Sequence, residues 1–445
     1  MSNLWIPNFD RYFLFNPTGK VAAKCLKLVL RTLWLSQKGD GMVSGRPIPE
    51  VFLQYIGEKL GFTPHVITID DPPTEPLNLL QTIMDRPQIL GEIRSQGSKH
   101  GWKIAPLISH PLAFDIGRAA ALSVRGTSEE MVRAGLINTG NDKADFAQKC
   151  DELDIPRTRA WICHNGNGIG DVARQFLFIE AWWLVIRLAR SAGGLGNWLF
   201  TSQESFLREF SKMNRHASTH PWATQQTLVE PFIPGLTPVS VVMKLDDDGP
   251  RQIATSLRML NGLESVGCVI PAPRIRGLER AEELTMAYAI LMWLMGCREV
   301  LDVDWGINEA TGEVYAFESN MRELLTSIAL NLGARYEALW AHPVVMIYDE
   351  APLPEPPSVD HMVTLDAKLA DLIHFANRAV WKTKNGASVD IVVVPLDMDK
   401  KRCRSFAFAT IATNMRVAEA ARAEFRGLIA QAAKIRRKPR EAVHA

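Results

Sequence analysis

Acidic and apolar side chains alternate on both sides of a turn in residues 301–322, and this stretch constrains the fold more than any other. A β-hairpin centred on Thr311 would place Asp304 opposite Glu318 and Asp302 opposite Asn320. Strand side chains alternate between faces, so one face would gather the acids. The other face would gather the apolar side chains Val303, Trp305, Ile307, Tyr315 and Phe317. We therefore predict a hairpin with one face packed on a core and one face carrying carboxylates.

The acidic face is a candidate metal site. Directly opposed residues of a strand pair have Cβ atoms roughly 5 Å apart, and like charges at that distance destabilise the pair. A divalent cation removes this repulsion, and carboxylate and amide oxygens are the ligands that Mg²⁺ selects. The shared face of Asp302, Asp304, Glu318 and Asn320 is therefore a candidate site for Mg²⁺, or for Mn²⁺, and Arg322 would share it. The alternative is a solvent-facing polar side of the hairpin, on which hydrated acids repel only mildly.

The length of the chain, 445 residues, predicts two or three domains. Fifty basic residues against 49 acidic ones give no electrostatic reason to expect nucleic acid or an anionic membrane as a partner. The most apolar runs are too short to span a bilayer, and the N-terminal residues do not form a secretory signal. Six cysteines without a CxxC pair suggest neither a disulfide framework nor a zinc site, so a cytoplasmic protein with free thiols is the simplest interpretation.

Alternating strand and helix patterns in the first third predict an open α/β domain at residues 1–135. The expected strands are Leu4–Pro7, His65–Ile69 and Pro106–Ser109, and the expected helices are Val21–Leu35 and Pro49–Leu60. A central block follows, which we divide into a small lobe at 136–225 and a large lobe at 226–350. A proline-rich linker at 351–360 precedes a small unit at 361–445, with a helix, two alternating strands and a helix. The fold class is therefore α/β (α+β).

Two basic residues of the central block are candidate phosphate ligands. Arg187 lies in an otherwise apolar predicted strand, where a lone charge needs a partner. The glycine-rich segment 191–196 follows, and glycines let backbone N–H groups approach phosphate oxygens. Lys143 opens a predicted helix for which Asn141 or Asp142 is a plausible N-cap. Neither the P-loop pattern nor a GxGxxG dinucleotide unit occurs. Each signal is weak alone, because glycine-rich turns and lysines at helix starts are common.

The order of these features resembles the ATP-grasp family. Its members have an early lysine, a basic strand residue before a glycine-rich loop, a strand that ends in an acidic hinge, and a hairpin that carries Asp, Glu and Asn. The resemblance implies that phosphates are held by Lys143, Arg187 and the loop glycines Gly193, Gly194 and Gly196. It implies that adenine meets the hinge Glu230, Pro231, Phe232 and Ile233, and that Mg²⁺ is bound by Asp304, Glu318 and Asn320. Arg187 and Arg322 are the catalytic candidates, with Arg322 on the transferred phosphoryl group.

Within the family, the chain resembles the pheganomycin-type peptide ligases over its whole length, but in short stretches. The opening Trp5-Ile-Pro-Asn-Phe-Asp10 is similar to the first strand of their pre-ATP-grasp domain, and Ser265–Ala272 is similar to their Gly-Cys-x-x-Pro segment. A small C-terminal α/β domain follows in both. The resemblance implies an ATP-dependent ligase that joins a carboxylate to an amine through an acyl phosphate, with amino acids or peptides as substrates in specialised metabolism. A homodimer is the family-level expectation.

Three departures from the family pattern affect this hypothesis. Arg187 stands where lysine is usual, Leu236-Thr-Pro238 stands where many relatives place an acid for ribose, and Glu323–Ser327 replaces a glycine-rich run. Two alternatives therefore stay open, a kinase that phosphorylates a hydroxyl and a relative that binds nucleotide without catalysis. The histidines show no ligand or triad spacing, and Cys268 has no identifiable base, so a packed thiol is the better interpretation of that cysteine.

Overall fold

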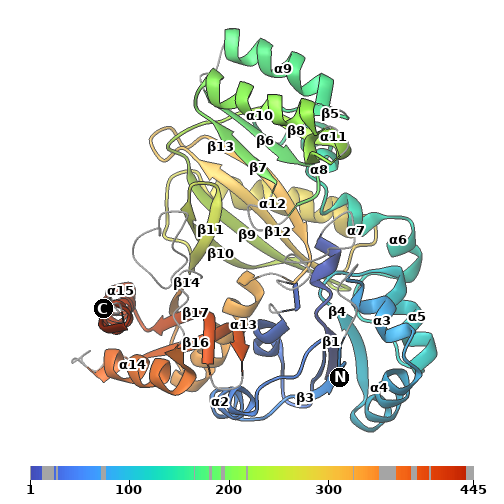
Figure 1. The fold of residues 1–445 in the computed structure, drawn as a ribbon, viewed down its shortest axis with the longest axis vertical. Helices are drawn as coiled ribbons and strands as arrows, with labels where there is room; N and C mark the ends of the chain where they lie inside the picture. The colour runs from blue at the N-terminus through green and yellow to red at the C-terminus, as the bar shows by residue number, and fades with distance from the viewer. Residues whose placement is uncertain are drawn as a thin grey trace, which may run out of the picture.

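The computed structural model describes residues 2–12, 25–26, 29–71, 77–164, 166–179, 183–191, 196–216, 219–323, 325–349, 367–381, 388–399 and 402–436. Gly193, Gly194 and the linker expected at 351–360 lie outside these residues. The described residues form three β-sheets with helices packed on them. In Figure 1 the smallest antiparallel sheet lies at the top and the largest sheet crosses the middle, while the N-terminal sheet and the C-terminal elements lie below.

The N-terminal sheet has four parallel strands in the order β3-β2-β1-β4. The strands are β1 (Ser2–Ile6), β2 (Gly41–Ser44), β3 (His65–Thr68) and β4 (Trp102–Pro106). The predicted α/β arrangement is confirmed. The strand expected at Pro106–Ser109 is wrong, because the strand runs earlier and ends at Pro106. Trp102 explains the shift, since its side chain is buried and its indole N–H donates to the Gly39 carbonyl at 2.8 Å.

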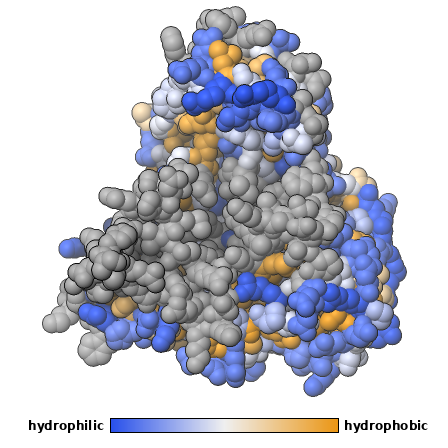
Figure 2. All heavy atoms as spheres, in the orientation of Figure 1, coloured by the Kyte–Doolittle hydropathy of each residue, from blue (hydrophilic) through white to orange (hydrophobic). Residues whose placement is uncertain are grey.

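Amphipathic helices accompany this sheet. They are α2 (Glu50–Leu60), α3 (Leu79–Met84), α4 (Pro87–His100) and α5 (Pro111–Ala120), with 3-10 turns η1 (Phe9–Tyr12) and η2 (Leu33–Leu35). Helix α5 buries Ala113, Ile116 and Ala120 at helical spacing. The outer faces are polar, and Figure 2 shows hydrophilic side chains over the α4–α5 side of the molecule. Two short helices, α6 (Glu129–Arg133) and α7 (Leu136–Thr139), lead to the central block.

His110 caps α5 with a neutral ring, and this contact makes stability depend on pH. Its Nδ1 accepts the N–H of Leu112 at 3.2 Å. Burial and the neighbouring Arg11 lower the pKa of His110 to about 4, although Asp115 opposes them. Because the folded pKa lies below the ordinary value of 6.5, the stabilising contribution is present above pH 6.5 and lost as the pH falls through 4.

We expect the substitution His110→Asn to flatten this dependence, because asparagine keeps a capping oxygen but does not titrate. The measurement is the free energy of unfolding in urea at several pH values between 4 and 7. The free energy of unfolding should change with pH more steeply in the wild type than in the variant, by up to about 1.4 kcal/mol per pH unit. Equal slopes for the two proteins would contradict the capping role.

The smallest antiparallel sheet has the strand order β5-β8-β6-β7. Its strands are β5 (Trp161–Cys163), β6 (Leu184–Leu188), β7 (Asn197–Phe200) and β8 (Thr227–Pro231), with helices α9 (Gly166–Ile179), α10 (Gln203–Arg215) and α11 (Pro221–Thr224). Helix α8 (Lys143–Glu152) begins where it was predicted, with Asp142 as its N-cap. It packs against β8 of this sheet and against the largest sheet, so it joins the two.

The largest sheet has the strand order β13-β12-β9-β10-β11-β14-β17-β15, and β16 pairs with β17. Its strands are β9 (Thr237–Asp246), β10 (Gly249–Asn261), β11 (Glu264–Ile270), β12 (Val300–Ile307), β13 (Val314–Met321), β14 (Val345–Asp349), β15 (Ala367–Lys368), β16 (Val389–Asp399) and β17 (Arg402–Ala412). Its helices are α12 (Leu278–Leu294), α13 (Leu325–Trp340), α14 (Leu369–Trp381) and α15 (Met415–Arg436). The described C-terminal elements follow in the order β15, α14, β16, β17 and α15, and they continue the central sheet through the β14–β17 pair. The boundaries of the C-terminal unit stay a prediction.

Two hydrophobic cores lie on opposite faces of the largest sheet. On one face, Val241 and Val303 pack with Tyr288 of α12. On the other face, one core joins the N-terminal and C-terminal thirds of the chain and includes Trp34 and Phe408. Because side chains alternate along a strand, the neighbours of Val241 and Val303 point away from α12. The acidic side chains of the hairpin therefore lie on the face away from α12.

The hairpin β12–β13 has the predicted register, with Asp304 opposite Glu318 and Asp302 opposite Asn320. The register then shifts by one residue, so that Trp305 pairs with Ala316 and Phe317 becomes the extra residue of a β-bulge. The prediction that Tyr315 and Phe317 share the core face is therefore wrong. Val314 and Ala316 are the residues buried in the core, while both aromatic side chains are half-buried.

Gly267, in the segment Ser265–Ala272, lies where β11 comes close to β14. Its φ is +155°, and a Cβ atom there would lie 2.1 Å from the carbonyl oxygen of Tyr348. This neighbour is backbone, so the strand pair itself would have to move. We expect Gly267→Ala to lower the free energy of unfolding by roughly 2–4 kcal/mol. Urea denaturation measures this. Gly427→Ala is the matched control, because nothing lies within 4 Å of a Cβ there. Equal stability of the two variants would contradict the expectation.

Candidate functional site

Asp304 and Glu318 form one end of a row of polar side chains that crosses four strands of the largest sheet. The strand registers pair Ser256 of β10 with Ser240 of β9, Ser240 with Asp304 of β12, and Asp304 with Glu318 of β13. Directly paired residues point to the same face, so these four side chains lie side by side. The hydroxyl of Ser240 donates to the Asp304 carboxylate. The acids of the hairpin are thus part of a longer polar strip.

Lys143 reaches this row from the first turn of α8. Its Nζ lies 3.0 Å from Oε2 of Glu318 and donates to Oγ and the carbonyl oxygen of Ser191 at 3.2 and 3.3 Å. The side chain of Lys143 is only 4% exposed. Burial lowers the pKa of Lys143, and the Glu318 carboxylate opposes that effect. The lysine predicted from the sequence therefore meets the predicted acid.

Arg187 reaches the same acid from β6. Its Nε donates to Oε2 of Glu230 at 2.7 Å, its Nη2 donates to the carbonyl oxygen of Phe317 at 2.7 Å, and its Nη1 lies 4.0 Å from Oε2 of Glu318. Both partners of the Arg187–Glu230 pair are buried. The hydroxyl of Thr158 also donates to Glu230, at 3.3 Å. The Glu230 carboxylate is thus turned towards Arg187.

Glu318 is held as a carboxylate by these cations. Burial raises the pKa of Glu318, but Lys143 and Arg187 outweigh burial and bring the pKa down to about 2. The side chain keeps 25% of its surface exposed, so it also remains open to a ligand. Two cations, on α8 and on the smallest antiparallel sheet, therefore meet one anion of the largest sheet.

Asn320 and Arg322 continue the same strand and its end. Nδ2 of Asn320 donates to Oδ2 of Asp304 at 3.4 Å. Arg322 donates to the side-chain oxygen of Asn141, and Asn141 also bonds the backbone of Met321 through its Oδ1 and Nδ2 at 3.1 Å each. Asn141 therefore fixes the start of α8 against the end of β13.

Two charged residues beside the row, Arg258 and Asp302, had no assigned role in the sequence prediction. Arg258 of β10 was missed altogether, and its Nη2 lies 3.3 Å from Oδ2 of Asp302 and 3.2 Å from Oδ1 of Asp304. Burial and Asp304 raise the pKa of Asp302 to about 8, although Arg258 opposes them. The available signal was one of two arginines in a strand of alternating polarity, and its partners depend on the sheet order.

The structure describes all of the hinge, residues 230–233, but of the three loop glycines it describes Gly196 alone. Pro231 ends β8, and Phe232 and Ile233 follow it half-buried. The ring of Phe232 stacks on Trp183 with centroids 5.6 Å apart, and its N–H donates to the Trp183 carbonyl at 3.0 Å. Gly196 has a φ of +80° and accepts the N–H of Leu188 at 2.9 Å, which closes the turn before β7.

The donor set of the row fits a hard divalent cation. Asp304 and Glu318 keep 18% and 25% of their side chains exposed, so their oxygens remain accessible. Asn320 adds an amide oxygen, because its nitrogen is the atom turned to Asp304. A group of three or more His, Cys, Asp and Glu side chains arranged for a metal does not occur in the described part of the chain. Two carboxylates and one amide are nevertheless the oxygen ligands that suit Mg²⁺.

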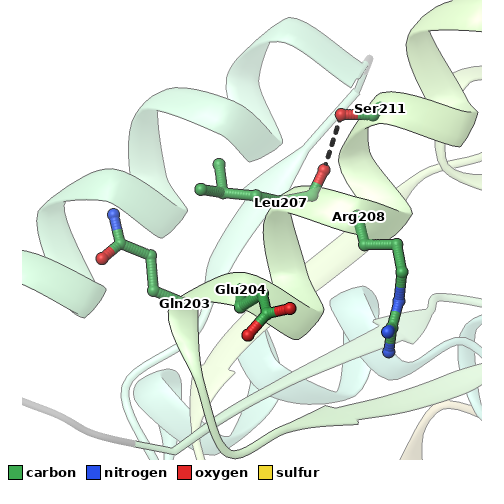
Figure 3. A pocket seen from close by; sticks show the side chains of 5 residues that line it. All are labelled: Gln203, Glu204, Leu207, Arg208 and Ser211. Carbon is green, nitrogen blue, oxygen red and sulfur yellow. Dashed lines mark hydrogen bonds between the residues drawn. The ribbon is translucent and has the colours of Figure 1, made fainter.

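A surface pocket lies elsewhere, along α10. Its volume is about 500 Å³, and it is lined by Gln203, Glu204, Leu207, Arg208 and Ser211. Figure 3 shows these side chains along α10, with the Ser211 hydroxyl donating to the Leu207 carbonyl. None of them contacts the polar row, so the pocket is separate from the candidate site.

Comparison with known proteins identifies the fold. Residues 29–122 match the family described as the Pre ATP-grasp domain. Solved structures align with almost the whole chain. A biotin carboxylase from Campylobacter jejuni shares 12% identity with a TM-score of 0.56, over 98% of this chain and 97% of that one. An N5-carboxyaminoimidazole synthase from Aspergillus clavatus, in complex with ADP and 5-aminoimidazole ribonucleotide, shares 11% identity with a TM-score of 0.56, over 96% and 99%.

A third structure, N5-carboxyaminoimidazole synthetase from Staphylococcus aureus in complex with ADP, shares 11% identity with a TM-score of 0.55, over 96% of this chain and 98% of that one. No curated protein sequence matches significantly. The chain therefore has an ATP-grasp fold with an N-terminal pre-ATP-grasp domain. None of the described helices has the length and apolar character needed to cross a membrane.

Proposed function

We propose that the protein is an ATP-dependent ligase that joins a carboxylate to an amine. The observation that carries the proposal is the meeting of Lys143 and Arg187 with Glu318 beside Asp304. A triphosphate needs cations for its oxygens and a divalent ion for its remaining charge, and this arrangement supplies ligands for both. On an ATP-grasp fold, such a set supports nucleotide binding followed by phosphoryl transfer.

In this proposal the residues divide into three groups. Lys143 and Arg187 neutralise phosphate charge. The glycines Gly193, Gly194 and Gly196 let backbone N–H groups approach the phosphate oxygens. Adenine meets the hinge Glu230, Pro231, Phe232 and Ile233, with backbone groups as its partners, because the Glu230 carboxylate is committed to Arg187. Asp304, Glu318 and Asn320 would hold Mg²⁺ or Mn²⁺, and the ion would supply counter-charge to the triphosphate.

The reaction follows from positioning and charge neutralisation. The substrate carboxylate attacks the γ-phosphorus in line, so that an acyl phosphate forms and ADP leaves. The amine then attacks the acyl carbon, and phosphate and a proton are released as the C–N bond forms. Arg322, held by Asn141 at the end of β13, stabilises the departing phosphate. Exclusion of water protects the acyl phosphate from hydrolysis.

The substrates of this reaction are proposed to be amino acids or a peptide, in specialised metabolism. The resemblance of Ser265–Ala272 and the N-terminal segment to the pheganomycin-type peptide ligases supports this choice. The Aspergillus clavatus structure contains an aminoimidazole ribonucleotide, which is also a small-molecule amine. A homodimer and a cytoplasmic location remain predictions.

The experiment that tests the function measures ADP release with ATP, Mg²⁺ and pools of amino acids and peptides, with mass spectrometry of the products. We expect ADP together with a product lighter by one water than its two precursors. ADP with a phosphate-bearing product would instead establish a kinase. ATP binding without ADP release from any pool would favour a protein that binds nucleotide without catalysis.

A further inference from the structure

Arg258 lies at the other end of the polar row from Lys143 and has no role in the reaction so far. Its Nε donates to Oγ of Ser240 at 2.8 Å, and its Nη2 contacts Asp302 and Asp304. These contacts use one edge of the guanidinium group. No hydrogen-bond partner of Nη1 lies within the part of the chain that the structure describes, and the side chain keeps 14% of its surface exposed.

A second donor near Arg258 also lacks a partner among the described residues. Ser256 lies two residues earlier on the same face of β10. It is 0% exposed, and among the described residues its hydroxyl has no hydrogen-bond partner. A buried hydroxyl without a partner is costly, so a ligand or water is expected there. A purely structural ion pair would explain neither the free Nη1 nor the hydroxyl.

The position of Arg258 indicates which anion it would meet. Strands β9 and β12 separate its strand β10 from β13, which carries Glu318. Lys143 and Arg187 contact the row at the Glu318 end, where the phosphates are proposed to bind. Arg258 contacts the same Asp304 from the opposite side. A second anion held by Arg258 would therefore lie next to the transferred phosphoryl group without competing with the triphosphate for cations.

We propose that Arg258 binds the carboxylate of the acyl donor through its Nη1 edge, with the Ser256 hydroxyl as a second donor. Arginine presents a planar fork that matches a carboxylate, and such charge-assisted hydrogen bonds are strong and directional. Asp302 is fully buried and holds the guanidinium group in place, so it is a positioning residue for Arg258. This inference rests on the proposed ligase function and adds to it the binding site of the acyl donor.

The test compares Arg258→Gln with wild type in the ADP-release assay, using the amino acid that supports turnover. We expect the KM for the acid to rise about tenfold or more while the KM for ATP stays within about twofold. Arg258→Lys should recover part of the loss, because it keeps the charge without the fork. Arg251→Gln is the matched control on the same strand and should leave both KM values unchanged. Arg251 is 64% exposed, and its ion-pair partner among the described residues is Asp246 at 3.5 Å.

Binding of Mn²⁺ with ADP, followed by electron paramagnetic resonance, separates this role from a structural one. Arg258→Gln should bind Mn²⁺ and ADP at least as tightly as wild type does, because it removes a cation that competes for Asp304. If the KM values for acid and ATP rise together and Mn²⁺ binding falls, or if the KM for the acid does not change, the inference is overturned.

If Arg258→Gln does not fold, Ser256→Ala provides the test, with an expected rise of about threefold in the KM for the acid alone. Wild-type protein that releases no ADP with any acid would overturn the proposed function and this inference together, whereas an unchanged variant of an active wild type overturns only this inference.

Discussion

Glu318→Ala should reduce ADP formation by about 10³-fold or more while the protein remains folded. Glu318 is the anion that Lys143 and Arg187 both approach, and it is one of the two carboxylates in the proposed metal site. Its loss removes a metal ligand and the ion-pair partner of Lys143, while Arg187 keeps its hydrogen bond to Glu230. The fold should survive, because the side chain is 25% exposed and the β12–β13 pairing depends on backbone hydrogen bonds.

Glu313→Ala is the matched control for this prediction. Glu313 lies in the exposed turn of the same hairpin, where it accepts the Thr311 hydroxyl at 3.0 Å. Its removal should leave ADP formation within about twofold of wild type, as is usual for a surface residue. Circular dichroism and urea denaturation of both variants verify that they are folded. Wild-type rates from Glu318→Ala would contradict both the metal assignment and the phosphate site.

The acid–base state of Glu318 gives the same prediction a pH signature. Its pKa is lowered to about 2 by Lys143 and Arg187, so the group stays ionised throughout the range in which activity can be measured. A depressed carboxyl pKa contributes stability above its ordinary value of 4.5, and this contribution is lost as the pH falls through 2. Any decrease in activity between pH 5 and 8 should therefore arise from groups other than Glu318.

The sequence predicted the hairpin well, because its two strands are neighbours in the chain and the position of the turn sets their register. The alternation around Thr311 was enough to pair Asp304 with Glu318 and Asp302 with Asn320. The bulge at Phe317 was not predictable in this way. A one-residue insertion is decided by what fills the core, and here Val314 and Ala316 fit against α12 where aromatic rings were expected.

The parts of the site that the sequence did not predict depend on non-local strand order. Arg258 meets Asp302 and Asp304 only because β9 lies between β10 and β12. Nothing in the neighbourhood of Arg258 in the sequence identifies those partners. The direction of the Glu230 side chain has the same origin, since β8 pairs with β6 and brings Glu230 against Arg187. Sequence position assigned Glu230 to the hinge, and sheet pairing determined which residue its carboxylate contacts.

The contact between Glu230 and Arg187 leads to the second large effect. Glu230→Gln should destabilise the protein by up to about 3–5 kcal/mol, because the Arg187 guanidinium group would stay buried without a full counter-charge. Urea denaturation measures this loss. Thr158→Val is the matched control, since it removes only the hydrogen bond of 3.3 Å to the same carboxylate and should cost about 0.5–1.5 kcal/mol.

The same variant distinguishes two roles for Glu230 in nucleotide binding. If the carboxylate acts by holding Arg187 in place, Glu230→Gln should raise the KM for ATP and for GTP by the same factor, because phosphates are common to both. If the carboxylate contacts the base, the ratio of the two KM values should change instead. The pair geometry, with Nε of Arg187 at 2.7 Å from Oε2 of Glu230, favours the first outcome. A double-mutant cycle with Arg187→Met and Glu230→Leu then measures the coupling, and a coupling energy near zero would show that the two side chains act independently.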